Sequence, residues 1–200
     1  DLERDDAVWH LLLQSFSTLG GSRGWEGLIG NPANYRQVTF EAIKKCAASR
    51  RLQQVEETLL AAKVRYPKRK AEHLVVNFAL VEGMGGPVEA RRQLLDQPGR
   101  EGKMAFLKRF KGIGNKYARN ILMDVYHPDF RNSIALDSRV RGISSALGLE
   151  FSNDQEHEEY YLGVAKKAGL NGWEVDRLLY NFRDKVLLRL GRLLPARSKS

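Results

Sequence analysis

Cysteine is almost absent from this 200-residue chain, since Cys46 is its single thiol. One cysteine excludes an intrachain disulfide framework, a four-thiolate zinc site and a four-cysteine iron–sulfur cluster. Histidine is scarce too, and His10, His73, His127 and His157 are scattered without the spacing of metal ligands. We therefore expect surface or core histidines, no metal site made by side chains and no cofactor.

Long apolar runs are also missing: no stretch approaches the roughly 18 to 20 uncharged residues of a membrane span. The first ten residues, DLERDDAVWH, lack the basic start of a signal peptide. We expect an intracellular protein without a membrane partner. The 42% of hydrophobic residues suffices for a core, so a folded domain or two small lobes are expected rather than a disordered chain.

Acidic residues are outnumbered by basic ones, 24 against 33, which gives a formal net charge of +9. A surface of this charge attracts polyanions, and nucleic acid is the first candidate. The alternative is a basic protein whose charge serves only solubility. The first reading predicts a DNA-associated protein of the cytoplasm or nucleoid.

Apolar residues recur at helical spacing nearly everywhere, and glycine, proline and asparagine separate the periodic stretches. Start signals are Ser152 with Gln155, Asn171 with Glu174, and Pro87 in a first turn. The pattern predicts an all-α protein of about ten helices. Their expected ranges are 5–18, 38–48, 51–64, 67–82, 87–96, 99–110, 115–126, 138–147, 153–168 and 172–191.

A basic turn stands out between two of these helices. From Glu101 to Asp124 no acidic residue intervenes, while six cations surround a Gly-Ile-Gly at 112–114. Glycine lets a backbone approach a ligand closely, and the amides that open a helix can face a phosphate. The plainer alternative is a simple helix–turn–helix connection with a solvated charged face. The cluster KVRYPKRK at 63–70 either extends this surface or serves only solubility. The cations of the turn are Lys103, Lys108, Arg109, Lys111, Lys116 and Arg119.

Two residues near this turn suit chemistry as well as structure. Lys116 opens the second helix, where helix amides and neighbouring cations disfavour the charged form of an amine, as an amine nucleophile requires. The alternative is an exposed or phosphate-contacting lysine. Asp137 follows an apolar run and precedes a helix, which also makes it a good N-cap worth about 1 kcal/mol. If the chain folds back, Lys116 and Asp137 share one cleft.

These segments carry a resemblance to a known family. FLKRFKGIGNKYARNI at 106–121 and IALDSRV at 134–140 resemble the helix-hairpin-helix (HhH-GPD) DNA glycosylase superfamily, whose bifunctional members have a lysine after the hairpin and a downstream VDxHV-like aspartate. With LLLQSFSTL at 11–19 and KRKAEHLVV at 68–76, the likeness spans residues 8–190. It is greatest to the small archaeal-type 8-oxoguanine glycosylase/lyases without an iron–sulfur cluster. Ser138 and Arg139 depart from it, because many relatives have a histidine two places after the aspartate.

The resemblance implies a two-lobed helical fold that binds duplex DNA in the cleft between the lobes. One lobe would combine residues 1–30 with 148–200, and the other would hold 31–147 with the hairpin at about 106–126. Lys116 would attack the sugar of an extruded nucleotide and form a Schiff base, and Asp137 would stabilise the positive charge that develops.

The resemblance also implies which residues would touch DNA. Phosphate would be bound by the hairpin, with a possible monovalent cation on its backbone carbonyls. Gln14 and Phe16 are candidate wedge residues, although Phe16 is equally suited to a core, and Trp173 and Tyr180 are candidates to stack on the base. The expected phosphate-binding residues are Lys111, Gly112, Ile113, Gly114, Arg119 and Arg139.

Three functions follow for testing. The first is a monomeric base-excision glycosylase with AP lyase activity on oxidised bases, 8-oxoguanine first. The second is the same chemistry on oxidised pyrimidines such as thymine glycol. The third is a non-catalytic helix-hairpin-helix module that binds DNA, which would need neither the lysine nor the returning aspartate.

Overall fold

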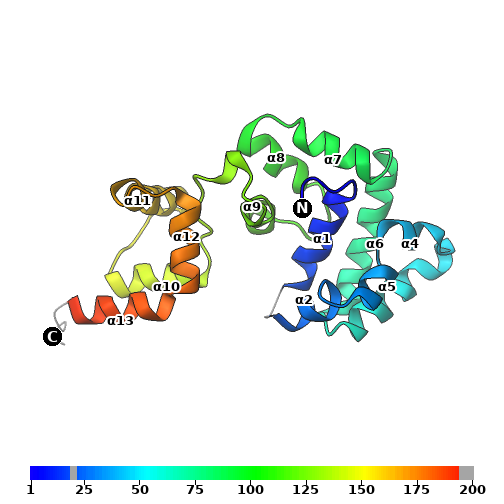
Figure 1. The fold of residues 1–200 in the computed structure, drawn as a ribbon, viewed down its shortest axis with the longest axis horizontal. Helices are drawn as coiled ribbons and strands as arrows, with labels where there is room; N and C mark the ends of the chain where they lie inside the picture. Colours follow the sequence, from blue (N-terminus) through cyan, green and yellow to red (C-terminus); the bar gives the residue numbers. More distant parts are fainter. Residues whose placement is uncertain (19–21, 194–200) are drawn as a thin grey trace. The chain divides into compact units, whose positions relative to one another are not determined.

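The computed structural model describes residues 1–18 and 22–193, and every regular element within them is helical. The expected all-α class is confirmed (Figure 1). The described residues form thirteen α-helices and two short 3-10 helices, η1 (Ala48–Arg50) and η2 (Pro128–Phe130). The α-helices are α1 (Ala7–Ser17), α2 (Ser22–Leu28), α3 (Pro32–Gln37), α4 (Phe40–Lys45), α5 (Arg51–Ala61), α6 (Pro67–Gly83), α7 (Pro87–Leu95), α8 (Gly99–Leu107), α9 (Asn115–Asp124), α10 (Ser138–Leu147), α11 (Asp154–Lys167), α12 (Gly172–Asn181) and α13 (Arg183–Leu193).

Three observed helices, α2, α3 and α13, differ from the helices expected from the sequence. The short helices α2 and α3 lie among glycine, proline and asparagine residues that the sequence pattern marks as loops. Asn31 caps α3 by accepting from two backbone amides, and Pro32 occupies the first helical position. The single helix expected over 172–191 is wrong, because Phe182, with φ −118° and ψ 21°, separates α12 from α13. The apolar stripe continues across this break, so periodicity alone does not reveal it.

The helix start signals are confirmed at two of three places. Asn171 and Glu174 form a reciprocal capping box, and Pro87 stands at the first position of α7. At α11 the expected start at Ser152 is wrong by one residue. There the Asn153 side chain accepts from the Glu156 amide at 2.9 Å.

The chain divides into two compact units, unit 1 (Asp1–Ile121) and unit 2 (Leu122–Ser200). The expected pairing of residues 1–30 with 148–200 in one lobe, and of 31–147 in the other, stays a prediction. Among the helices of residues 1–18 and 22–193, none has the length and apolar character that crossing a bilayer requires.

Unit 1 is built around α1, whose residues are buried on nearly every side. The Trp9 ring meets Phe40 and Phe78 edge-on at centroid distances of 5.7 and 6.3 Å. Its indole N–H donates to the Val38 carbonyl at 2.9 Å, so the one polar atom of the ring is satisfied inside the core. Helix α6 packs along α5, and α7 packs on α1 (Figure 1). This core is the support for the hairpin described below.

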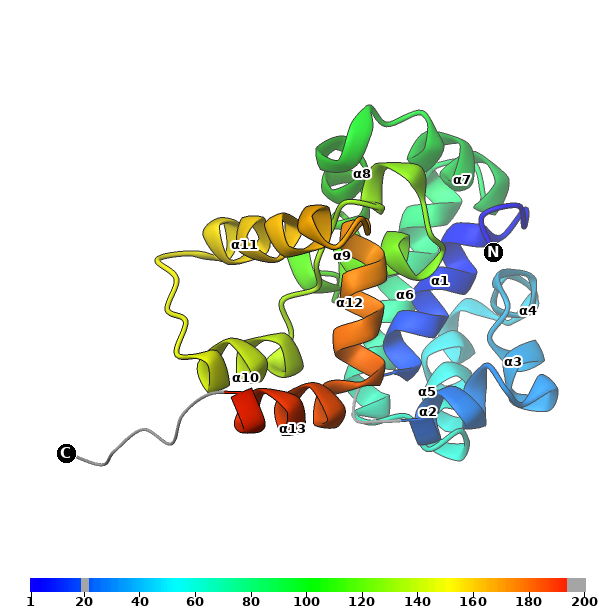
Figure 2. The ribbon, with the colours of Figure 1, turned by 60° about the vertical axis from the view of Figure 1, so that its left-hand side comes forward.

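Unit 2 has a smaller core, in which α12 contacts α10, α11 and α13 (Figure 2). Carboxylates fasten the non-helical segment before α10 to this core. The Glu158 carboxylate accepts from the Ile134 amide at 3.0 Å, and the Asp176 carboxylate accepts from the Ala135 amide at 2.8 Å. These bonds hold the backbone just before Asp137 in place. The buried apolar residues of the core are Ile134, Val140, Tyr161, Ala165 and Val175.

Candidate nucleic-acid interface

The Gly-Ile-Gly turn joins α8 to α9 through a tight connection anchored by buried side chains. Phe110 and Ile113 are buried, and the Ile113 amide donates to the Phe110 carbonyl at 3.1 Å. Gly112 has φ +86°, a value that favours glycine. The Ala118 amide donates to the Gly114 carbonyl at 2.9 Å, which begins α9. The apolar anchors thus leave Lys111, Gly112 and Gly114 exposed.

One buried amide from α6 holds the backbone of this turn. The Asn77 side chain is fully buried, and its oxygen accepts from the Lys111 amide at 2.7 Å. Its nitrogen donates to the Lys111 carbonyl at 3.1 Å. Both polar groups of one peptide residue are therefore satisfied by a single side chain. This pairing fixes the position of the backbone directly before Gly112.

Gly112 also lies in close contact with α1 and α6. A Cβ at this position would come within 2.5 Å of His73 Nδ1 and 3.1 Å of the Phe16 ring. At Gly114 a Cβ would meet no atom within 4 Å. The first glycine is therefore required by packing as well as by φ, whereas the second leaves an open backbone surface where a ligand could approach.

Charges of the second basic cluster and of the hairpin act on the same side chain, that of His73. Burial lowers the pKa of His73, and the charges of Arg69 and Lys111 lower it further. Lys70 is buried, and its ammonium group donates to the Phe16 carbonyl at 2.5 Å. Burial, followed by the charges of Arg69 and Arg65, lowers the pKa of Lys70 to about 8. Cations of both segments therefore act on the same histidine, and the choice between a cluster at 63–70 that extends the hairpin surface and one that serves only solubility stays a prediction.

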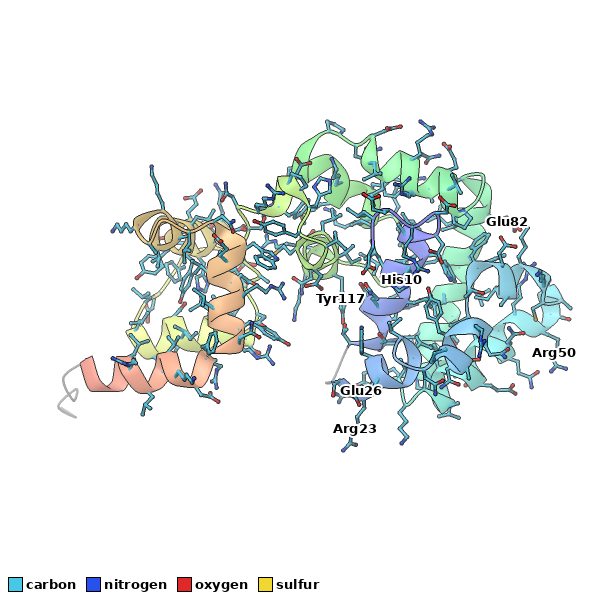
Figure 3. The ribbon with its side chains drawn as sticks, viewed as in Figure 1. His10, Arg23, Glu26, Arg50, Glu82 and Tyr117 are labelled. Carbon is cyan, nitrogen blue, oxygen red and sulfur yellow. The ribbon has the colours of Figure 1, made fainter. Side chains whose placement is uncertain are left out.

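Lys116 is the second residue of α9 and is exposed. The amides of a first helical turn have no partner inside the helix, so an anion can approach them here. The next residue, Tyr117, is half-buried, and burial raises the pKa of its hydroxyl (Figure 3). Lys116 therefore stands at the exposed end of the hairpin, beside backbone suited to a phosphate.

The two candidate wedge residues occupy different environments at the end of α1. Phe16 is buried, and its ring lies 6.1 Å from the His73 ring, as expected for a core residue. Its insertion into DNA would require it to leave this position, and the wedge role stays a prediction. Gln14 is half-buried, with its amide nitrogen 3.0 Å from His10 Nε2.

In unit 2, Asp137 is the N-cap of α10, as one of its two expected roles predicts. Its Oδ1 atom accepts from the Arg139 amide at 2.8 Å and from the Val140 amide at 3.1 Å. The neighbouring Asp176 is buried; burial raises the pKa of Asp176, and the charge of Asp137 adds to this effect. Asp137 thus has a fixed place beside a second carboxylate.

The other expected DNA contacts of unit 2 lie close to one another. The Arg139 guanidinium stacks 3.9 Å from the centre of the Tyr180 ring. Trp173, at the start of α12, is half-buried and donates its indole N–H to the Met123 carbonyl at 2.7 Å. These three side chains form part of a longer series of rings and guanidinium groups.

The expected site residues therefore fall into two sets. Unit 1 contains Gln14, Phe16, Lys111, the three hairpin residues 112–114, Lys116 and Arg119; unit 2 contains Asp137, Arg139, Trp173 and Tyr180. The meeting of Lys116 and Asp137 in one cleft stays a prediction.

Sequence reasoning missed three residues that organise the hairpin: Lys70, His73 and Asn77. A signal was available for Asn77, because it interrupts the apolar stretch LVVNFAL on a helix. A polar side chain in such a place is normally buried with a partner. The identity of that partner, the backbone of Lys111, was not readable from the sequence.

Two hollows, one in each unit, are lined by none of the expected site residues. In unit 2 a hollow of about 690 Å³ is lined by the connection between α10 and α11 and by Arg141 and Asp154 beside it. In unit 1 a hollow of about 420 Å³ lies beside α2, next to Arg23 and Asn34. Across residues 1–18 and 22–193, no three histidine, cysteine or acidic side chains cluster in a way that could hold a metal ion.

Comparison with protein-family models, with curated protein sequences and with solved structures gives no match to this chain.

Proposed function

We propose that this protein is a base-excision DNA glycosylase with AP lyase activity, which removes oxidised bases from duplex DNA, 8-oxoguanine before others. The hairpin carries the proposal: a turn held by Asn77, with Lys111, Gly112 and Gly114 exposed, and an exposed Lys116 two residues after Gly114. The resemblance of this segment and of IALDSRV to helix-hairpin-helix glycosylases of the small archaeal type supports it.

In the proposed reaction, the backbone of residues 112–114 binds a DNA phosphate, and the damaged nucleotide is extruded because its glycosidic bond is unreachable in the stack. The Lys116 amine attacks the sugar C1′ atom. The glycosidic bond breaks, and the base leaves with the bonding electrons and takes up a proton. Opening of the sugar ring gives a Schiff base, which permits β-elimination of the 3′ phosphate.

Asp137 is the proposed carboxylate of this reaction. Both capping bonds of Asp137 end on Oδ1, so the cap and the chemistry make use of different oxygens. Its negative charge would stabilise the positive charge that develops on the sugar and assist proton movement.

The decisive experiment is borohydride trapping on a duplex that contains 8-oxoguanine. Wild-type protein and Lys108→Gln should become covalently attached to DNA, whereas Lys116→Gln should not. Lys108 is the matched control, because it is an exposed lysine at the end of α8 and is not among the expected phosphate-binding residues. Trapping that survives in Lys116→Gln would remove this lysine from the role of nucleophile.

Asp137→Asn tests the carboxylate without removing the cap, because asparagine caps helices as well as aspartate does. Base excision should slow by about 100-fold or more, while DNA binding changes little. An unchanged rate would leave Asp137 as a cap only.

A panel of lesion duplexes separates the related functions. Nicking without alkali indicates a lyase, and nicking only after alkali indicates a monofunctional glycosylase. A preference for thymine glycol would indicate that the same reaction acts on oxidised pyrimidines. No nicking across the panel would favour a non-catalytic DNA-binding module, for which the exposed hairpin of unit 1 would suffice.

A further inference from the structure

Unit 2 carries a continuous series of aromatic rings and guanidinium groups, each in contact with the next. The Arg131 guanidinium lies 4.6 Å from the centre of the Tyr126 ring, and that ring lies 4.7 Å from the ring of Trp173. Arg177 follows, 5.5 Å from the Trp173 ring and 5.9 Å from the Tyr180 ring. Arg139 stacks on Tyr180 at 3.9 Å. We call this series the arginine–aromatic ladder; in spatial order it comprises Arg131, Tyr126, Trp173, Arg177, Tyr180 and Arg139.

Hydrogen bonds to the surrounding chain hold the ladder in place. The Trp173 indole is tied to the Met123 carbonyl at 2.7 Å, and its backbone amide donates to the Arg131 carbonyl at 2.8 Å. The Arg177 guanidinium donates to Asp124 at 3.0 Å. These bonds act on ring edges, on backbone and on one guanidinium. The side chains are therefore ordered in advance, which reduces the entropy lost when a ligand binds.

The two ends of the ladder are open to solvent. Tyr126 is 38% exposed and Tyr180 is 47% exposed, and Arg131 is exposed as well. At the two ends, Arg131 and Arg139 stack on a ring with one face, and the second face and N–H edges of a stacked guanidinium can meet another partner. Arg177, in the middle, is instead paired with Asp124 and Asp176. The ladder can therefore accept further flat rings and negatively charged groups.

The combination of rings and guanidinium groups identifies the chemistry of the ligand. Aromatic and guanidinium faces stack on unpaired bases of any sequence, and guanidinium edges bind phosphate oxygens. A strand with a flat base and a negative charge in every residue matches this combination. Paired bases in a duplex do not expose their faces, and an acidic peptide has the charge without the rings. Trp173 and Tyr180, expected above to receive one extruded base, are thus part of a surface for several.

We propose that the arginine–aromatic ladder of unit 2 binds single-stranded nucleic acid, with unpaired bases stacked on its rings and phosphates bound by Arg131 and Arg139 at its ends. This binding is independent of the proposed base excision, since it needs neither a lesion nor Lys116.

The test compares two labelled strands of equal length and charge by fluorescence anisotropy with the full chain. One is undamaged oligo(dT), and the other carries propane-1,3-diol in place of each nucleoside, so that it has neither bases nor the sugar that an AP lyase would bind. The wild-type protein should bind oligo(dT) about fivefold or more tightly than the strand without bases, because base–aromatic stacking supplies the difference.

Two variants locate the effect. Arg139→Lys keeps the positive charge and removes the planar group, and Tyr180→Leu keeps an apolar side chain and removes the ring. Each should weaken binding of oligo(dT) about fivefold and leave binding of the strand without bases unchanged. Both sites are at least partly exposed, and helix content measured by circular dichroism verifies that each variant folds.

Matched controls come from the same unit. Arg141→Lys changes a half-exposed arginine paired with Asp154 at 2.8 Å, and Tyr160→Leu changes a tyrosine that is 40% exposed on α11. Both should alter binding of either strand by less than about twofold, the range of an ordinary surface change.

Equal binding of the two strands by wild-type protein would overturn the proposal, as would equal losses in ladder and control variants. Either result would mean that charge alone attracts the strand. Failure of borohydride trapping would overturn the proposed glycosylase/lyase chemistry of Lys116 and leave this inference intact, so the two failures are distinguishable.

Discussion

Unit 1 and unit 2 hold their candidate functional segments by different means. In unit 1 the hairpin is held by a neutral amide, Asn77, and by close packing of Gly112 on a large aromatic core. In unit 2 the segment before Asp137 is held by the carboxylates of Glu158 and Asp176 over a small core. Geometry in unit 1 therefore depends on packing, whereas in unit 2 it depends on buried acids.

The largest expected effect is on the core of unit 1. Trp9→Ala removes a fully buried ring and its hydrogen bond to Val38, and should lower the free energy of unfolding by about 3–5 kcal/mol. Val175→Ala in the core of unit 2 should cost only about 1.5 kcal/mol, because the substitution removes just the two γ methyl groups of the buried valine. Urea denaturation measures both. Equal costs would contradict the contrast drawn between the two cores.

The second prediction compares the two glycines of the hairpin. Gly112→Ala should destabilise the protein by about 1–3 kcal/mol, because φ is +86° and the new Cβ would meet His73 and Phe16. Its affinity for duplex DNA should fall as the turn is displaced. Gly114→Ala, where a Cβ meets nothing within 4 Å, is the matched control and should leave thermal stability almost unchanged. Similar shifts in both melting temperatures would show that packing on Gly112 is unimportant.

The third prediction concerns the carboxylates of unit 2. Asp176→Leu leaves the half-buried Ala135 amide without its acceptor and should cost about 1–3 kcal/mol in the free energy of unfolding. Asp184→Leu replaces an acid whose side chain is 93% exposed and should stay within about 0.5 kcal/mol of wild type. Chemical denaturation of the two variants in parallel provides the measurement. A neutral result for Asp176→Leu would mean that this carboxylate does not hold the segment.

The last prediction is a pH dependence of stability that has opposite signs in the two units. The pKa of Lys70 falls from 10.5 to about 8 on burial, so between these values the unfolded chain binds a proton that the folded chain lacks. The stability of wild type relative to Lys70→Met should therefore rise from pH 8 to pH 10.5.

For Asp176 burial raises the pKa above 3.8, and the folded chain is the one that holds the extra proton. The stability of wild type relative to Asp176→Asn should therefore fall as the pH rises above 3.8. Urea midpoints measured across pH would test both signs. A change of the same sign in both pairs would contradict the assigned burial.

Much of the helical pattern was predictable because its signals are local. The range 138–147 expected for α10 is the observed one, since Asp137 caps its start and Gly148, with φ 70°, ends it. The short helices α2 and α3 were missed because six or seven residues are too few to show a period. The break at Phe182 was missed because it leaves the apolar spacing intact.

The candidate site was predictable only where neighbours in sequence form it. The basic hairpin, with Lys116 after its glycines, could be read from one short stretch. The supports of the hairpin could not, because Asn77 binds backbone 34 residues away and Lys70 binds backbone 54 residues away. A sequence shows that a buried amide or amine needs a partner, and the fold decides which carbonyl or amide that partner is.

The position of Asn77 next to a core residue affects how the turn responds to heating. Its neighbour Phe78 packs on Phe40 at a centroid distance of 4.6 Å, deep in the core, so adjacent residues of α6 serve the core and the turn. On heating, the turn should keep its shape until the aromatic cluster itself melts, and recognition would then be lost in one cooperative step rather than by gradual loosening.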